Sequence, residues 1–110
     1  MSETVLHSLD DYERGIAAAP RVLLFKHSPL CPISADARVE YEEFAAAHPE
    51  AVRLFVDVIA DRPVARGLAE RCGVRHESPQ AILFVGGKAV WSASHHDITA
   101  AALARAVLGG

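Results

Sequence analysis

The sequence predicts an α/β fold in which a mixed β-sheet lies between layers of helices. Three observations indicate it: helical and strand-like periods alternate along the chain, the strand-like runs are apolar, and Gly86-Gly87 separates the last two runs. At 110 residues, 51% of them hydrophobic, the chain has the size of one domain and enough apolar residues for a core. We therefore expect a single domain over residues 1–110.

The first predicted elements are a helix that ends at Pro20 and a strand over residues 21–26. Ser8, with Asp11 three residues later, has the pattern of an N-terminal cap. The residues 21–26 form a nearly continuous apolar run, as a strand buried on both faces requires. The helix carries a stripe of apolar residues at helical spacing, formed by Leu9, Tyr12 and Ile16.

A second helix is expected to begin at Cys31-Pro32, after a loop over residues 27–30, and to end before Pro49. The next apolar run, over residues 52–58, predicts a second buried strand. The inward face of the helix is expected to consist of Ile33, Ala37, Tyr41 and Phe44.

The third predicted helix is capped by Asp61, carries Pro63 in its first turn and ends at Gly73, which suits a left-handed C-terminal position. Its apolar stripe consists of Val64, Leu68 and Cys72.

A β-hairpin and a last helix, capped by Thr99, complete the chain. Residues 81–85 and 88–93 are the hairpin strands, and Gly86-Gly87 is the tight turn between them. Strands separated by helices imply parallel pairing, whereas the hairpin adds an antiparallel edge. This order of elements predicts a thioredoxin-like three-layer sandwich, with a mixed central sheet, flanking helices and a C-terminal β-hairpin plus helix.

The charge pattern argues against nucleic acid and membranes as partners. The formal net charge is −3, and acidic and basic residues are interspersed along the chain. Nucleic acids and anionic membranes require a clustered basic face instead. The N-terminal residues lack the pattern of a signal peptide, and no apolar run approaches the length of a membrane-spanning helix. We therefore expect a cytoplasmic protein.

Cys31 is the candidate catalytic nucleophile. It follows a buried strand and directly precedes a helix that begins with Pro32. Proline suits the first helical position, where its missing N–H costs nothing. The free N–H groups and the dipole of the helix start stabilise negative charge, and the thiolate is the form of cysteine that attacks disulfides. This placement predicts a reactive thiol.

Ser34 stands three residues after Cys31, where a two-cysteine oxidoreductase carries its second, resolving thiol. Its hydroxyl can donate to the Cys31 sulfur but cannot form a disulfide. The motif Cys31-Pro32-Ile33-Ser34 is thus a one-thiol version of a Cys-x-x-Cys site.

Two further features are expected near the nucleophile. In thioredoxin-like folds an X-Pro bond just before the third strand is cis and abuts the active cysteine, so we expect a cis Ser78-Pro79 bond in the substrate-binding region. Lys26 ends the strand that leads to Cys31, and a cation there would favour the thiolate, so we assign Lys26 with Ser78 and Pro79 to the substrate-binding region.

The remaining cysteine and the histidines are not expected to do chemistry. Cys72 lies on an apolar stripe and is interpreted as an unreactive cysteine that packs in the core. The pair His95-His96 lacks the spacing at which histidines converge on a metal ion, so no metal site is predicted. His27 and His76 flank loops at the same end of the sheet, where a solvent-facing or capping role is favoured.

The chain resembles the YtxJ proteins, which are monothiol bacilliredoxins, from about residue 6 to residue 107. Cys-Pro-Ile-Ser alone is a weak signal, and the His-Glu-Ser-Pro-Gln segment makes it specific. The segments that carry the resemblance are Leu24–Ser28, Cys31–Ser34, Asp57-Val58, Asp61–Pro63, Gly73–Gln80, Val90–His95 and Ile98-Thr99.

The resemblance implies a thiol–disulfide oxidoreductase that uses bacillithiol, a small thiol that some bacteria use in place of glutathione. Cys31 would attack the mixed disulfide between a client protein and bacillithiol, and a second thiol would then release the bacillithiol from Cys31. No bound metal or organic cofactor is implied. Two alternatives stay open: a binding or stress protein whose Cys31 is only a target of thiolation, and an iron–sulfur carrier like the one-thiol glutaredoxins. Pro32 and Ile33 depart from the Cys-Gly-Phe-Ser pattern of those carriers.

Overall fold

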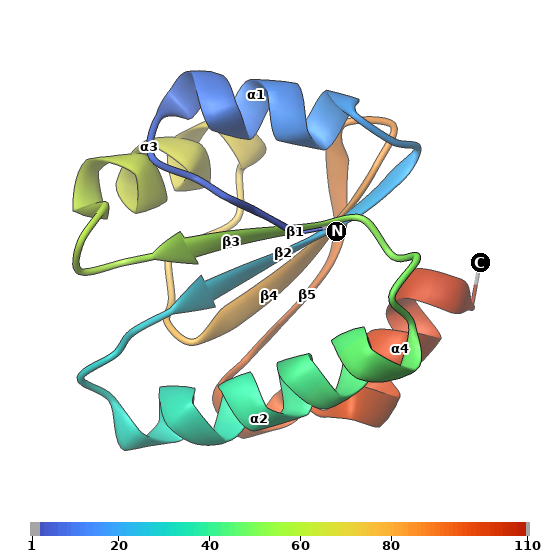
Figure 1. Cartoon of the computed structure of the whole chain (residues 1–110). Coiled ribbons are helices and arrows are strands. Elements are labelled where there is room, and N and C mark those ends of the chain that lie inside the picture. Colours follow the sequence, from blue (N-terminus) through green and yellow to red (C-terminus); the bar gives the residue numbers. More distant parts are fainter. Residues whose placement is uncertain (1–2, 110) are drawn as a thin grey trace.

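The computed structural model describes residues 3–109, and helices and strands alternate along most of that length (Figure 1). In chain order the elements are β1 (Glu3–Val5), α1 (Leu9–Ala17), β2 (Arg21–His27), α2 (Pro32–Ala47), β3 (Arg53–Asp57), α3 (Arg62–Cys72), β4 (Gln80–Val85), β5 (Lys88–Ser94), a 3-10 turn (His95–Asp97) and α4 (Ala100–Leu108).

The strands form one mixed sheet in the order β1-β3-β2-β4-β5. β1, β3 and β2 run parallel, with Leu24 opposite Leu54 at the centre. β4 runs antiparallel to β2, and β5 returns antiparallel to β4. The predicted mixed sheet is therefore confirmed. The parallel pairing expected for strands separated by helices holds for β2 and β3, whereas β4, which follows α3, is antiparallel to β2.

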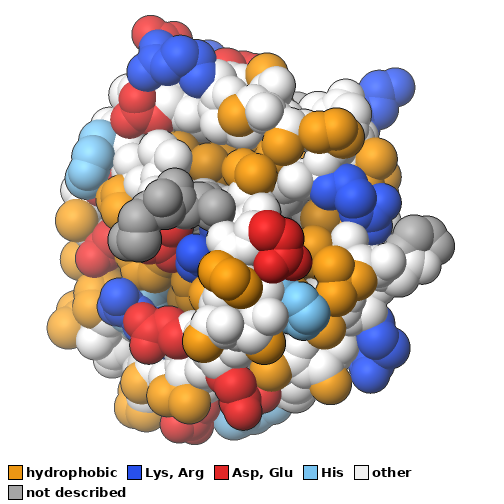
Figure 2. All heavy atoms as spheres, turned by 45° about the vertical axis from the view of Figure 1, so that its right-hand side comes forward, with side chains coloured by type: hydrophobic (Ala, Val, Ile, Leu, Met, Phe, Trp, Pro, Cys, Tyr) orange, Lys and Arg blue, Asp and Glu red, His pale blue; other side chains and the backbone are white. Residues whose placement is uncertain are grey.

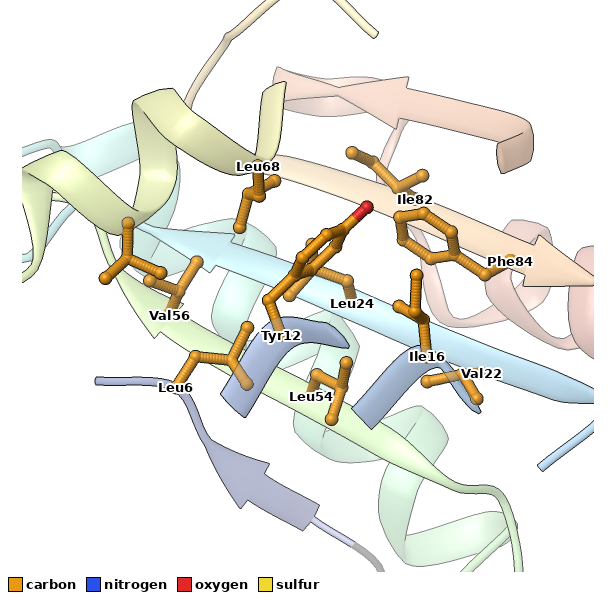
Figure 3. Close-up of a cluster of buried hydrophobic side chains, with 11 residues drawn as sticks. Leu6, Tyr12, Ile16, Val22, Leu24, Leu54, Val56, Leu68, Ile82 and Phe84 are labelled. Carbon is orange, nitrogen blue, oxygen red and sulfur yellow. The ribbon is translucent and has the colours of Figure 1, made fainter. Parts of the chain in front are cut away.

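The sheet lies between two layers of helices (Figure 1): α1 and α3 cover one face, and α2 and α4 cover the other. Side chains alternate between the faces along each strand, so β2 sends Val22 and Leu24 to the α1/α3 face and Leu23 and Phe25 to the other. Figure 3 shows the α1/α3 core, in which Tyr12 and Phe84 meet edge to face with ring centroids 5.9 Å apart. This is the predicted three-layer sandwich.

Most of the predicted local signals appear as expected. The Ser8 and Thr99 side chains accept hydrogen bonds from the N–H groups of Asp11 and Ala102, which caps α1 and α4. Gly73 ends α3 with φ 73°, and Gly86 and Gly87 take φ values of 60° and 80° in the hairpin turn. These conformations favour glycine because a Cβ atom would strain them.

Three local details differ from the predictions. Ser34 is completely buried on the inner face of α2, whereas Ile33, predicted to be inward, is only half-buried. Asp61 is the N-cap residue of α3 but makes no capping hydrogen bond, and its carboxylate lies 3.2 Å from the His7 ring. The short strand β1 was not predicted, because its partly exposed residues form no apolar run.

The surface carries mixed charge. On the face drawn in Figure 2, acidic and basic side chains alternate among apolar ones without a large cluster of one sign. Across residues 3–109, none of the helices combines the length and the apolar character needed to cross a bilayer.

Candidate active site

Cys31 occupies the N-cap position of α2. Its backbone is extended, with φ −109° and ψ 120°, and Pro32 follows within the first turn. The Cys31 N–H donates to the Ser28 carbonyl at 3.1 Å, which closes the loop between β2 and α2. The side chain is half-buried and makes no capping hydrogen bond to the helix. The thiol is thus held at the helix start and remains accessible.

The first turn of α2 leaves one backbone N–H group available to an anion. Pro32 has no N–H, and the N–H groups of Ser34 and Ala35 both donate to the Cys31 carbonyl, at 3.0 and 3.2 Å. Within residues 3–109 the Ile33 N–H has no hydrogen-bond acceptor. A thiolate on Cys31 is the nearest anion in sequence that this donor and the helix dipole can stabilise.

The buried Ser34 hydroxyl joins α2 to the end of β2. Its Oγ accepts the Ser28 N–H at 2.9 Å and lies 2.8 Å from Nδ1 of His27. Because the Ser28 carbonyl in turn accepts the Cys31 N–H, these bonds hold the loop that precedes Cys31. Among the described residues Ser34 makes no hydrogen bond to the Cys31 sulfur, so its expected donation to that sulfur stays a prediction.

The protonation of the His27 ring determines whether the Ser34 hydroxyl donates its proton to that ring. The ring is buried between Phe25 and Phe55, at centroid distances of 6.1 and 5.7 Å. Burial, with a contribution from the nearby Arg38, lowers the pKa of His27 and favours the neutral ring. With the ring proton on Nε2, Ser34 donates to Nδ1; with the proton on Nδ1, the hydroxyl proton is free for another acceptor. The His27 tautomer therefore controls whether the Ser34 hydroxyl has a proton left to donate to the Cys31 sulfur.

Lys26 lies on the other side of the sheet from α2. It shares the α1/α3 face with Leu24, is completely buried, and donates from Nζ to Oε1 of Gln80 at 2.9 Å. Burial lowers its pKa to about 8, and the charges that act against this are those of Cys72 and Glu77. The structure thus pairs Lys26 with Gln80 and does not bond it to Cys31. Its expected role in substrate binding stays a prediction.

The Ser78-Pro79 bond is cis, as predicted. Pro79 is buried directly before β4, and its carbonyl accepts the His95 N–H at 3.1 Å. Ser78 and Ser28 line the same cavity of about 180 Å³, so the structure brings the cis-proline loop and the cysteine loop together. The assignment of Ser78 and Pro79 to substrate binding stays a prediction.

Cys72 has different surroundings. It lies at the C-terminal end of α3, where its thiol donates to the Ala69 carbonyl at 3.8 Å. The side chain packs against the α1/α3 core and is half-buried rather than enclosed. Within residues 3–109 there is no group of three or more His, Cys, Asp or Glu side chains arranged to hold a metal ion.

Comparison with known families identifies the chain. The sequence model described as "Monothiol bacilliredoxin BrxC" matches residues 4–103. The chain belongs to the monothiol bacilliredoxin family. This confirms the family resemblance seen in the sequence and assigns the protein to thiol redox chemistry within the bacillithiol system.

Solved structures similar to this bacilliredoxin share its fold. A candidate oxidoreductase with a thioredoxin fold is 35% identical, covers 96% of this chain and 93% of its own, and superposes with a TM-score of 0.88. Mitochondrial thioredoxin 3 from Saccharomyces cerevisiae is 16% identical, with coverages of 99% and 96% and a TM-score of 0.77. A thioredoxin mutant from Halobacterium salinarum is 18% identical, with coverages of 98% and 89% and a TM-score of 0.77. The last two show the thioredoxin fold alone.

Sequence reasoning did not find every residue around the bacilliredoxin nucleophile. His27 was expected to face solvent or to cap an element, and it is buried against Ser34 instead. The available signal was the alternation of β2, which places His27 on the same face as Phe25. Gln80 was quoted only as part of the family resemblance, yet it is the buried partner of Lys26.

Proposed function

We propose that this bacilliredoxin removes bacillithiol from mixed disulfides on client proteins through the Cys31 thiolate. The observation that supports this most directly is the position of Cys31 as the N-cap of α2, beside the unpaired Ile33 N–H and without a second thiol in the motif. The exchange occurs where thiols are kept reduced, so we assign the protein to the cytoplasm.

The first step transfers bacillithiol from the client to Cys31. The thiolate attacks the bacillithiol sulfur of the mixed disulfide, a Cys31–bacillithiol disulfide forms, and the client leaves as a thiolate that takes up a proton. The number of disulfides is unchanged, so no external oxidant, metal or bound organic cofactor is needed.

The second step needs a thiol from outside the motif, because residue 34 is serine. A second bacillithiol attacks the Cys31 adduct, bacillithiol disulfide leaves, and the Cys31 thiolate is regenerated. The Ser34 hydroxyl takes no covalent part, and its bonds to Ser28 and His27 hold the loop of the nucleophile in place.

Turnover with a bacillithiolated client protein tests this proposal. The wild type is expected to release the client in the presence of bacillithiol, with a mass increase on Cys31 at each cycle. Cys31→Ser is expected to be inactive, and Cys72→Ala is the matched control that keeps the nucleophile. If Cys31 takes up bacillithiol from bacillithiol disulfide but releases no bacillithiolated client, the protein is a thiolation target rather than an exchanger.

A further inference from the structure

A polar cavity opens beside the loop that joins β2 to α2 and precedes Cys31. Its volume is about 180 Å³, and it lies between the end of β2, the start of α3 and the cis-proline loop. Its polar and charged lining consists of Ser28, Arg62, Arg66, His76 and Ser78. Ligand pockets for whole small molecules usually measure about 300–1,000 Å³, so this cavity has room for one polar group of a ligand.

The charge of the cavity is positive. Arg62 and Arg66 are one helical turn apart on α3 and therefore share a face. Neither forms an ion pair with another of residues 3–109, although seven other side-chain pairs in that range do. Two arginines that line one cavity with no carboxylate partner form a site suited to an anion.

Within residues 3–109, the acidic side chains near the cavity form no ion pair with Arg62 or Arg66. The Asp61 carboxylate faces the His7 ring, and an Asp57 oxygen accepts the N–H groups of Ile59 and Ala60. Glu77, in the neighbouring loop, lies 4.0 Å from Nδ1 of His95, and Glu70, one turn after Arg66 on α3, forms an ion pair with neither arginine among the described residues. The start of α3, where Arg62 stands, also lacks a side-chain cap, and a helix N-terminus attracts anions.

His76 contributes a polar ring to the same cavity. Burial lowers its pKa, and the neighbouring Lys26 and Arg66 add to this effect. The neutral ring can donate one hydrogen bond to a bound anion.

The cavity is connected to the backbone of Cys31 through its wall residue Ser28. Its wall residue Ser28 accepts the Cys31 N–H at 3.1 Å, and Ser78 stands next to the cis-proline. A small molecule joined to Cys31 through a disulfide would therefore have an anion-binding cavity beside it.

We propose that this cavity binds a carboxylate of the small thiol that Cys31 exchanges, through Arg62 and Arg66. The inference rests on the proposed function, and it defines the co-substrate as a thiol that carries carboxylate groups. Bidentate arginine–carboxylate bonds fix orientation as well as charge, so the cavity positions the disulfide for attack. The Cys31 thiolate attacks one sulfur of the bound disulfide, a Cys31 mixed disulfide forms, and the second thiolate leaves.

Small disulfides of different charge test the site. The disulfides of bacillithiol and glutathione both carry carboxylates, whereas bis(2-hydroxyethyl) disulfide is neutral and cystamine is cationic. The rate of formation of the Cys31 mixed disulfide is measured by mass spectrometry for the wild type and for Arg62→Gln/Arg66→Gln. The control is Lys88→Gln/Arg105→Gln, which lowers the net charge equally at two exposed positions away from the cavity.

The double arginine variant is expected to react about tenfold or more slowly with the two carboxylate disulfides, since charge-assisted hydrogen bonds are lost. Its rate with the neutral disulfide should stay within about twofold, its rate with cystamine should not fall, and the control should match the wild type. Equal losses with all disulfides, no loss at all, or a loss seen only with a client protein that presents acidic residues would overturn the proposal.

The outcomes of this experiment distinguish a failure of the carboxylate site from a failure of the proposed function. A wild type that discriminates by charge but never releases a client would contradict the proposed function and leave the carboxylate site standing. A wild type that releases clients normally while both variants behave alike would contradict only the carboxylate site.

Discussion

The two cysteines of this bacilliredoxin lie on different helices and at opposite ends of them: Cys31 at the start of α2 and Cys72 at the end of α3. Cys31 is the N-cap residue of α2, next to an unpaired N–H and the positive end of the helix dipole. Cys72 is the last residue of α3, at the negative end, where its thiol donates to the Ala69 carbonyl. The two side chains are both half-buried, so exposure does not separate them. The helix end at which each thiol stands is therefore the difference from which we expect Cys31 to be the more reactive of the two.

The largest expected effect is the difference in reactivity between the two thiols. Cys31 should be alkylated by iodoacetamide at neutral pH at least about tenfold faster than Cys72, because the start of α2 stabilises a thiolate whereas the end of α3 does not. Peptide mass spectrometry at timed intervals measures the two rates. In denaturant the two alkylation rates should become equal. Equal rates in the native protein would contradict the expectation that the start of α2 activates Cys31.

A second thiol placed beside Cys31 should change the chemistry of the site. In Ser34→Cys the bacillithiol adduct on Cys31 should be displaced from within the molecule, because residues 31 and 34 are one helical turn apart. The variant should accumulate as an internal disulfide that a dithiol reopens. Mass spectrometry after mixing with bacillithiol disulfide measures the loss of two hydrogens.

The buried position of Ser34 makes this variant a stringent test. A persistent adduct on Cys31, without an internal disulfide, would mean that residue 34 keeps facing His27 and Ser28 as it does in the native protein. Ala35→Cys, at an exposed neighbouring position on the same helix, is the control for the mere presence of an extra thiol.

Removal of the Ser34 hydroxyl should destabilise the nucleophile loop. Ser34→Ala leaves the Ser28 N–H and Nδ1 of His27 without their buried partner, which costs about 1–3 kcal/mol of unfolding free energy. Urea unfolding measures the loss, and Ser92→Ala at an exposed position of β5 should change stability by less than about 0.5 kcal/mol. A loss equal to that of Ser92→Ala would show that the buried bonds contribute no stability.

The fold and the position of Cys31 could be predicted because their signals are local. Capping by Ser8 and Thr99, the left-handed Gly73 and the Gly86-Gly87 turn depend on residues close in sequence, and each appears in the structure. The strand β1 could not be predicted, because it has only three residues and its strand geometry comes from pairing with β3.

The surroundings of Cys31 depend on tertiary contacts and were harder to predict. The sequence suggested the nearby Cys31 as the partner of the Ser34 hydroxyl. In the structure its hydrogen-bond partners are His27, at the end of β2, and Ser28, which follows it. Lys26 is close to Cys31 in sequence, yet the alternation of β2 turns it to the opposite face of the sheet from α2. Proximity in sequence therefore did not identify the hydrogen-bond partners that the structure gives to Ser34 and Lys26.

The smallest expected effect concerns Lys26, whose side chain lies on the same side of the sheet as Cys72 and not on the side of α2. The Lys26 ammonium is buried beside Gln80, and burial lowers its pKa to about 8 from the ordinary value of 10.5. Below pH 8 the group is charged in the folded and the unfolded chain, so the cost of its burial is fully present. Between pH 8 and 10.5 the folded protein loses the proton while the unfolded chain keeps it, and the stability of the fold rises with pH.

Lys26→Met isolates this contribution, because it keeps a long side chain and removes the titrating group. The unfolding free energy of the wild type relative to Lys26→Met should rise between pH 8 and pH 10, by at most about 1.4 kcal/mol per pH unit. Urea unfolding at half-unit steps of pH measures the difference, and the exposed Lys88→Met should show no such trend. A flat difference for Lys26→Met would mean that the ammonium reaches water in solution.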